Sequence, residues 1–516
     1  MILITSAAYI SPGLISEFGK LPPCMLPVQN KRLYEHQISL ISRNEFIVLS
    51  LPESFQLRDF DRRKLNEFGV RVIFVPDSLS LGGSVVYTLN VCARYEEPIH
   101  ILHGDTLFDK LPDGLDVCLV SKAEDDYSWD RVDSDKNVYA GYFSFSSQSL
   151  LIQKITENNY NFIQGIEAYN NFLFIQKIVV SFWLDFGLVN SYYRSISKMT
   201  TQRVFNSLNV NRYSVTKYSE DSRKILAEAN WFSSLPKDLK HYAPALWNSG
   251  VQDGRGFYEI EYYYLSSLAN LFVFGKNPPF IWEEIIMSCI DFINDIAKYS
   301  PSSDDISKIS VQNDLLYAPK TLHRLKEYGK QRNISLSHSW VVNGVQVPSL
   351  LEIIAETDKM ISKNDCRFVR LMHGDFCFSN ILYDFKSKTI RVIDPRGLDL
   401  DGNCNIYGDL RYDVAKFAHS ILGLYDFIIG GVFSYSENDA YNVILDFEKN
   451  TQLDAIQEYF KQQCFAGYSL GELTTYPILV QLFLSMLPLH NDNELRQKAM
   501  LANALRLYVE LKRQKI

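Results

Sequence analysis

The chain has 516 residues, of which 47% are hydrophobic and 13% aromatic, and its formal net charge is −8. This length exceeds what one hydrophobic core normally supports, so we expect two or three domains, and the composition excludes extensive disorder. The acidic balance argues against a nucleic-acid partner, but it leaves room for a local basic cleft that binds a nucleotide.

Up to about residue 200, short apolar runs alternate with helical patterns. We expect helices at residues 32–41 and 82–95, and strands at residues 1–8, 44–51, 70–75, 99–105, 116–121, 140–146 and 179–187. Such alternation is typical of a mostly parallel sheet covered by helices. The fold class predicted for this part is therefore α/β.

Five motifs follow one another in residues 1–200: "CMLPVQNKRLYEHQISLI", "LGGSVVYTL", "IHILHGDTLFD", "AGYFSFS" and "SFWLDFGLVNSYYRSI". Their order resembles that of sugar-phosphate nucleotidyltransferases. The resemblance implies a Rossmann-like nucleotidyltransferase domain in which Asp105 and Asp185 hold magnesium on the phosphates of a nucleoside triphosphate such as CTP or UTP. Two acids at strand ends that face one crevice also suit a cation site on chemical grounds.

The loop after the first strand departs from that family. The family has a G-x-G-[ST]-R stretch followed by a Pro-Lys, whereas "SAAYISPGLISEFGKLPPCMLPV" has neither the glycine pattern nor the Arg, and Pro23 stands where the Lys is expected. Lys20 is a nearby substitute. Without amides and cations on the leaving pyrophosphate, transfer loses several kcal/mol of stabilisation. Three interpretations stay open: an active enzyme with an unusual loop, a binding module, and a structural partner.

Beyond residue 200 the pattern changes, and we place a domain boundary there. Residues 212–219 and 256–265 are predicted strands, and residues 220–236 have helical spacing before a Pro stop. Helices are expected to dominate from there to the end.

"HGDFCFSN" and "IDPRG" place three polar side chains at strand ends: Asp375, Asn380 five residues later, and Asp394 at the end of the next predicted strand. Phosphoryl transfer from Mg-ATP needs a carboxylate to orient the attacking hydroxyl, and oxygen ligands to hold magnesium. The pattern resembles the H-G-D-x-x-x-x-N...I-D signature of aminoglycoside phosphotransferases and choline kinase-like enzymes.

This second resemblance implies an α+β protein-kinase-like fold for residues 201–516, with a small lobe at about 201–280 and a helical lobe at about 281–516. It implies that Asp375 is the catalytic base, that Asn380 and Asp394 are magnesium ligands, and that His373 supports the loop.

The same fold requires a strand Lys that holds the ATP phosphates and a helix Glu that fixes it. Lys217 in "YSVTKYS" and Glu228 in "KILAEANW" are the candidates, with Lys224 as a rival to Lys217. A strand Lys and a helix Glu are also common surface residues.

In "YGDLRYDVAKFAHSILGLYD", Asp409 and Asp413 are predicted to cap the helix start and to brace the catalytic loop. Arg396 either contacts a substrate phosphate or pairs with a neighbouring acid, and the sequence does not decide between the two.

The eight cysteines are scattered without C-x-x-C pairs, which favours reduced thiols. The first residues lack the basic start and apolar core of a signal peptide, and no apolar run approaches the roughly 18 residues of a membrane span. We expect a cytoplasmic protein without a membrane span.

Together these features predict an ATP- and Mg²⁺-dependent kinase that phosphorylates a hydroxyl of a sugar or amino alcohol, fused to a nucleotidyltransferase-like domain. By analogy, such a fusion fits bacterial capsule or lipopolysaccharide biosynthesis. The alternatives are a bifunctional enzyme that makes a nucleotide-activated donor, and a non-catalytic scaffold with two degenerate enzyme domains. The sequence identifies neither the phosphate acceptor nor the oligomeric state.

Overall fold

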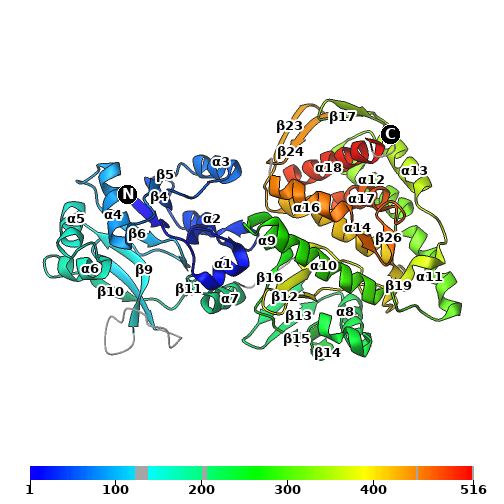
Figure 1. Cartoon of the computed structure of the whole chain (residues 1–516), viewed down its shortest axis with the longest axis horizontal. Coiled ribbons are helices and arrows are strands. Elements are labelled where there is room, and N and C mark those ends of the chain that lie inside the picture. Colours follow the sequence, from blue (N-terminus) through cyan, green and yellow to red (C-terminus); the bar gives the residue numbers. More distant parts are fainter. Residues whose placement is uncertain (123–136, 200–205, 449–450, 514–516) are drawn as a thin grey trace. The chain divides into compact units, whose positions relative to one another are not determined.

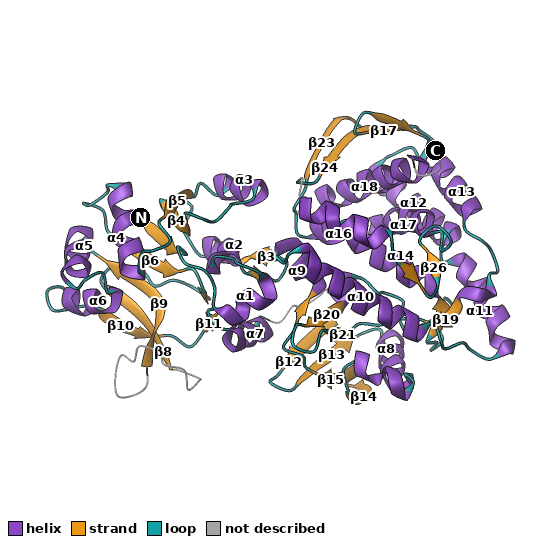
Figure 2. Cartoon of the chain, in the orientation of Figure 1, coloured by secondary structure: helices purple, strands orange, loops and turns teal. Residues whose placement is uncertain are grey.

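The computed structural model describes residues 1–122, 137–199, 206–448 and 451–513 (Figure 1). Two compact units are present: residues 1–199 with 274–276, and residues 200–273 with 277–516. The predicted boundary near residue 200 falls at residues outside those described. Both units contain helices and strands, which confirms the predicted α/β class (Figure 2).

The first unit is built on a seven-stranded sheet. Its order is β10 (Gln176–Val179), β8 (Val117–Lys122), β9 (Asn137–Phe145), β6 (Ile99–His103), β1 (Ile2–Thr5), β4 (Ile47–Pro52) and β5 (Arg71–Val75). Only β9 runs antiparallel to its neighbours among these strands. Every residue of β1 and β4 is buried, as expected for parallel strands covered on both faces.

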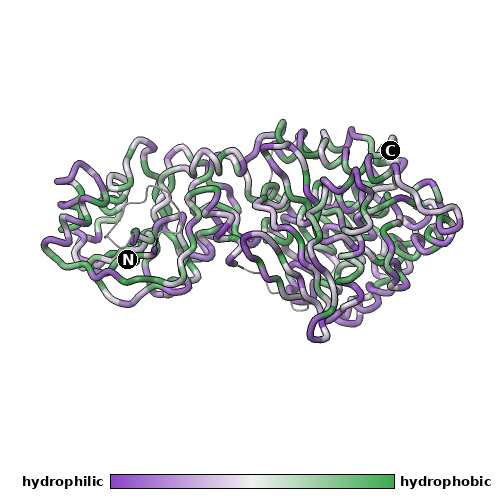
Figure 3. Tube along the Cα trace, turned by 90° about the horizontal axis from the view of Figure 1, so that it is seen from below, coloured by the Kyte–Doolittle hydropathy of each residue, from purple (hydrophilic) through white to green (hydrophobic). Residues whose placement is uncertain are grey.

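Helices accompany this sheet: α1 (Pro12–Phe18), α2 (Leu33–Ser39), α3 (Asp59–Glu67), α4 (Leu81–Cys92), α5 (Gln148–Glu157), α6 (Phe162–Asn170) and α7 (Val189–Lys198). A hydrophobic core joins apolar residues of the strands with those of α4, α5 and α6. Hydropathy alternates along the trace, as alternating buried strands and polar turns require (Figure 3). The helices predicted at 32–41 and 82–95 correspond to α2 and α4.

The strand predicted at residues 179–187 is wrong as a single element. Residues up to Val179 belong to β10 of the large sheet, whereas β11 (Trp183–Asp185) pairs antiparallel with β7 (Thr106–Phe108). The apolar run continues through the break, so hydrophobicity alone does not reveal it. The second pairing places Asp185 opposite Thr106, directly after Asp105.

The second unit begins with a four-stranded antiparallel sheet in the order β12 (Asn206–Val210), β13 (Ser214–Ser219), β15 (Arg255–Glu261) and β14 (Leu246–Gln252). Helix α8 (Ser222–Ser234) packs against β15 and starts at Asp221, whose side chain accepts the backbone N–H of Lys224 at 3.1 Å. The strand predicted at 256–265 ends at Glu261. Ser266–Ser267 form a separate strand, β16, which pairs with β20 (Ile381–Asp384) and through it with β21 (Thr389–Val392).

Helices form most of the remaining chain (Figure 2). They are α9 (Leu268–Phe274), α10 (Pro279–Ile296), α11 (Ser303–Leu315), α12 (Ala318–Arg332), α13 (Leu350–Met360), α14 (Leu410–Ile421), α15 (Tyr425–Ile429), α16 (Thr451–Lys461), α17 (Thr475–Met486) and α18 (Glu494–Arg513). Short strand pairs interrupt them: β19 (Val369–Leu371) with β22 (Tyr407–Asp409), and β25 (Cys464–Phe465) with β26 (Tyr468–Ser469).

A second sheet in this helical part was not predicted. Its order is β18 (Val345–Val347), β17 (Trp340–Val342), β24 (Asn442–Asp446) and β23 (Ser434–Asp439). Asn343 and Gly344 join β17 to β18 with φ angles of 50° and 76°. An Asn-Gly pair between Val-rich runs is a strong hairpin signal, so the sequence carried this information.

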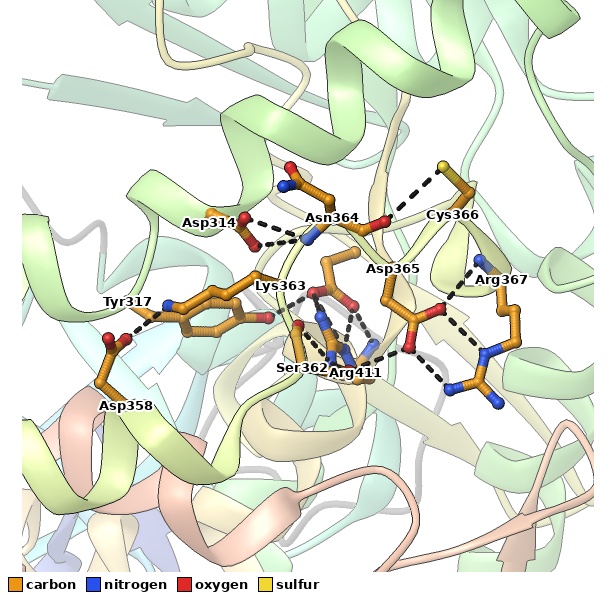
Figure 4. A network of polar contacts seen from close by, with 11 residues as sticks. Asp314, Tyr317, Asp358, Ser362, Lys363, Asn364, Asp365, Cys366, Arg367 and Arg411 are labelled. Atoms are coloured by element: carbon orange, nitrogen blue, oxygen red, sulfur yellow. Dashed lines mark hydrogen bonds and ion pairs between the residues drawn. The ribbon is translucent and has the colours of Figure 1, made fainter.

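The start of α14 is held by a buried ion pair (Figure 4). The Asp409 side chain caps the helix by accepting the backbone N–H of Arg411 at 2.9 Å, and the Arg411 guanidinium donates to both Asp409 oxygens. The Tyr317 hydroxyl donates to the same carboxylate at 2.6 Å. The predicted cap at Asp409 is therefore confirmed, and it fixes where α14 begins.

No helix among the described residues has both the length and the apolar character needed to cross a lipid bilayer.

Candidate functional site

The loop between β19 and β20 holds its shape through buried hydrogen bonds. The backbone N–H groups of His373 and Gly374 donate to the two Asp413 oxygens at 2.6 and 2.8 Å. The His373 ring bonds the Ile393 carbonyl at 3.0 Å, and burial lowers the pKa of His373 to about 4. A neutral, fixed imidazole and a bracing carboxylate, both predicted, therefore set the position of Asp375.

Asp375 and Asn380 lie together on this loop. The Asn380 side-chain amide donates to the Asp375 carboxylate and to its backbone carbonyl, each at 3.0 Å. The Asp375 side chain remains 42% exposed, so its carboxylate is open to a ligand.

Lys217 and Glu228 form the pair that the sequence proposed. The Lys217 ammonium lies 2.7 Å from the Glu228 carboxylate and 3.0 Å from that of Asp394. Burial lowers the pKa of Lys217, but the two carboxylates outweigh this effect and raise it, so the ammonium stays charged. The Tyr258 hydroxyl completes the cluster with a 3.1 Å bond to Glu228. The rival Lys224 has no salt bridge within 4 Å among the described residues.

Asp394 stands on a tightly constrained backbone. Its φ of 55° is in the left-handed region, which Asp adopts more readily than most other non-glycine residues. Three residues later, Gly397 has a φ of 64°, and a Cβ there would lie 2.1 Å from the carbonyl oxygen of Ala227 in α8. Glycine therefore lets the Asp394 segment approach the helix that carries Glu228.

Lys416 is a site residue that the sequence analysis missed. Its ammonium, from α14, lies 2.8 Å from the Asp375 carboxylate and is only 15% exposed. Partial removal from water raises the pKa of Asp375, but Lys416 outweighs it and lowers the pKa to about 2. Lys416 follows Asp413 by three residues and so shares its helix face, which was the only available signal.

These residues line one cavity of about 580 Å³ within the second unit. Such a volume is ordinary for a small-molecule site. The four acidic or amide candidates Asp375, Asn380, Asp394 and Glu228 and the cation Lys217 all contribute to its wall. The cavity wall also includes Lys224, Lys320, Arg324, Arg396, Asp399, Tyr412, Lys416, Leu482, Ser485, Met486 and Leu489.

The first unit holds the other two predicted site residues. A Cβ placed on Gly187 would lie 2.9 Å from an Asp105 oxygen and 3.3 Å from an Asp185 oxygen, so the two carboxylates converge. Burial raises the pKa of Asp105. A cation held between the two carboxylates would favour their charged forms and so oppose the effect of burial on the pKa of Asp105.

The atypical loop of the first unit contains α1 and a short 3-10 turn that starts at Pro23. The Lys20 ammonium lies 4.0 Å from the ring centroid of Tyr9. That Lys20 binds phosphate in place of the missing lysine stays a prediction.

No protein-family model matches the chain. No curated protein matches it either. Among solved structures, an aminoglycoside-3'-phosphotransferase of type VIII is 13% identical, with 54% of this chain and 87% of that chain covered at a TM-score of 0.31. A thermostable mutant of aminoglycoside phosphotransferase APH(4)-Ia with ADP and hygromycin B is 11% identical, with 59% and 92% covered at a TM-score of 0.37.

A protein from Bacillus anthracis assigned as a glucose-1-phosphate thymidylyltransferase is 13% identical, with 38% of this chain and 94% of that chain covered at a TM-score of 0.29. The solved structures that resemble this chain thus include kinases and a nucleotidyltransferase, each over part of its length.

Proposed function

We propose that residues 201–516 form an ATP-dependent kinase that phosphorylates a hydroxyl of a small molecule, with a small lobe at about 201–280 and a helical lobe at about 281–516. The observation that carries the proposal is the Lys217 ammonium, which bridges Glu228 and Asp394 at the wall of the cavity that also holds Asp375. A strand Lys, a helix Glu and a metal-binding Asp are the parts that phosphoryl transfer from ATP requires.

Each residue has a distinct task in this proposal. Lys217 contacts the ATP phosphates, and Glu228 holds it in place. Asp375 accepts a hydrogen bond from the attacking hydroxyl and orients it toward the γ-phosphate. Because catalysis of this reaction depends on positioning and charge stabilisation, the hydrogen bonds that the loop donates to Asp413 would contribute by fixing the position of Asp375.

Asn380 and Asp394 would hold Mg²⁺. Their donors are amide and carboxylate oxygens, which suit this hard cation, and magnesium sites on nucleotides commonly use one or two protein ligands together with phosphate oxygens. Bound magnesium would neutralise charge that develops on the phosphates.

Nucleotide binding tests the proposal directly. We expect ATP with magnesium to raise the melting temperature of the wild type, and Asp394→Asn to abolish the rise because a magnesium ligand is lost. Thermal shift with ATP, CTP, UTP, GTP and dTTP measures this. Asp105→Asn is the matched control, with the same chemical change in the other unit. ATP stabilisation that survives in Asp394→Asn would contradict the assignment.

A second activity is supported by the converging carboxylates of Asp105 and Asp185. If residues 1–200 bind a nucleoside triphosphate such as CTP or UTP through magnesium, a second nucleotide-dependent shift disappears only in Asp105→Asn. That result would favour the bifunctional enzyme, with a place in bacterial capsule or lipopolysaccharide biosynthesis by analogy. No stabilisation by any nucleotide would favour the scaffold.

We expect Lys416 to set the lower limit of the pH range in which the kinase is active. In Lys416→Met the Asp375 carboxylate loses the ammonium that favours its charged form, so its pKa rises from about 2. A protonated Asp375 cannot accept the hydroxyl hydrogen. The acidic limb of kcat/KM should therefore move up by about one pH unit or more.

The pH profile of ATP turnover measures this change. Lys386→Met, which removes an exposed cation from the turn between β20 and β21, serves as the control. An unchanged acidic limb in Lys416→Met would refute the role of Lys416.

A further inference from the structure

Four cations surround Tyr412 on the helical side of the cavity. Lys320 and Arg324 lie one turn apart on α12, and the Lys320 ammonium is 5.6 Å from the centroid of the Tyr412 ring. The Arg396 guanidinium carbon is 5.5 Å from the same centroid. Lys416 follows Tyr412 by one turn of α14. All five side chains line the cavity.

Carboxylates do not balance this cluster. Among the described residues, Lys320, Arg324 and Arg396 have no salt bridge within 4 Å, and Arg324 donates instead to the Ser485 carbonyl at 3.1 Å. Lys416 has Asp375 alone. On the cluster's own helix, Glu327 acts on Arg324 only at longer range.

The remaining acids of the cavity have other partners. Asp399 accepts two backbone N–H groups, of Asp401 and Asn403, at 3.0 and 2.8 Å. Asp394 pairs with Lys217. Six Lys and Arg side chains and four carboxylates line the cavity, so its wall carries an excess of positive charge.

The titration of the cluster agrees with this geometry. Burial raises the pKa of Tyr412, but Lys320, Lys416 and Arg396 outweigh it and lower the pKa to about 8. Tyr412 raises the pKa of Lys320, yet burial and the neighbouring cations outweigh that and lower it. Both shifts have the directions expected of a tyrosine and a lysine that lie among closely spaced cations.

The ATP triphosphate does not account for these charges. Lys217 and Lys224 come from β13 and α8 of the proposed small lobe and line the same cavity, where Lys217 meets Asp394. Three of the four cations come instead from α12 and α14, and Arg396 comes from the loop after β21. Lys416 is also the partner of Asp375, the carboxylate that would face the attacking hydroxyl. Apolar side chains of Leu482, Met486 and Leu489 lie on the same helical side. The cluster therefore lies beside the place that the proposed kinase function gives to the acceptor.

We propose that the phosphate acceptor is a hydroxyl compound that carries an oxyanion, a phosphate or a carboxylate, rather than a cationic amino alcohol or aminoglycoside. Lys320, Arg324 and Arg396 would bind the oxyanion, since guanidinium and ammonium groups recognise such anions and a cationic ligand would be repelled. This rests on the proposed kinase function.

The transfer itself balances without another reactant. The acceptor oxygen forms a bond to the γ-phosphorus, the bond from that phosphorus to the β,γ-bridging oxygen breaks, and its electron pair leaves with ADP. The hydroxyl proton passes to Asp375. The product carries one more phosphate than the already anionic acceptor.

The test is binding of small oxyanions at constant ionic strength, measured by thermal shift with and without MgADP. The probes are inorganic phosphate, glucose 6-phosphate and gluconate, against neutral glucose and cationic choline and kanamycin. Among these probes, we expect only the oxyanions to raise the melting temperature of the wild type. Lys320→Gln/Arg324→Gln should weaken their binding by about tenfold or more, since each charged hydrogen bond lost costs roughly that factor. The phosphate and carboxylate probes identify which oxyanion is preferred.

Lys326→Gln/Lys330→Gln is the matched control, because it removes two cations from the exposed face of the same helix. Equal oxyanion binding by both double variants, stabilisation by choline or kanamycin, or no oxyanion effect on the wild type would each overturn the proposal. The kinase assignment is tested separately, because it fails if ATP with magnesium does not raise the melting temperature of the wild type.

Discussion

Asp375→Asn should reduce phosphoryl transfer by about 10²- to 10⁴-fold, the usual contribution of a positioned base. The amide has the shape of the carboxylate, but it is neutral and cannot take up the proton of the acceptor hydroxyl. Lys416 also loses the partner that lies 2.8 Å away. ATP affinity should change little, because Lys217, Glu228, Asn380 and Asp394 remain. ADP release at saturating ATP measures kcat, and thermal shift measures nucleotide binding.

Asp446→Asn is the control for this variant, since it makes the same change at an exposed residue at the end of β24, outside the cavity. It should retain wild-type kcat. Turnover by Asp375→Asn within threefold of the wild type, or loss of ATP binding in that variant, would show that Asp375 does not orient the acceptor.

Gly397→Ala should strongly destabilise the second unit. The new Cβ would lie 2.1 Å from the Ala227 carbonyl oxygen and 2.9 Å from the Glu228 nitrogen, both in the backbone of α8. The residue also has a φ of 64°. Backbone strain and overpacking together should lower the free energy of unfolding by about 2–5 kcal/mol. Displacement of α8 would also move Glu228 from Lys217 and weaken ATP binding.

Gly431→Ala separates the cost of backbone strain from the cost of overpacking. This glycine has a φ of 72°, but nothing lies within 4 Å of an added Cβ, so only the strain of about 1–2 kcal/mol is expected. Urea unfolding of both variants, followed by ATP thermal shift, measures the difference. If Gly397→Ala is no less stable than Gly431→Ala, or binds ATP as the wild type does, the close approach does not hold the site.

The loop at Asp375 illustrates how much of the site was visible in the sequence. Asp375, Asn380 and Asp394 stand within twenty residues of one another, so local spacing alone placed them at neighbouring strand ends. Lys217 and Glu228 are two of several similar residues in this part of the sequence. Only the distances of 2.7 and 3.0 Å from the Lys217 ammonium to the carboxylates of Glu228 and Asp394 distinguish it from Lys224. Propensity cannot make that choice, because it carries no information on contacts distant in the chain.

The sequence by itself determined the alternation of helices and strands, the two-part organisation that we propose, and the polar signature from His373 to Asp394. Tertiary structure alone decided the rest. The cluster of Lys320, Arg324, Arg396 and Lys416 is drawn from segments that are up to 96 residues apart in the sequence, and each cation alone is an ordinary helix or loop residue. Charge repulsion and ion pairing depend on distances of a few ångströms, and only packing of α12 against α17 and of α17 against α14 sets those distances.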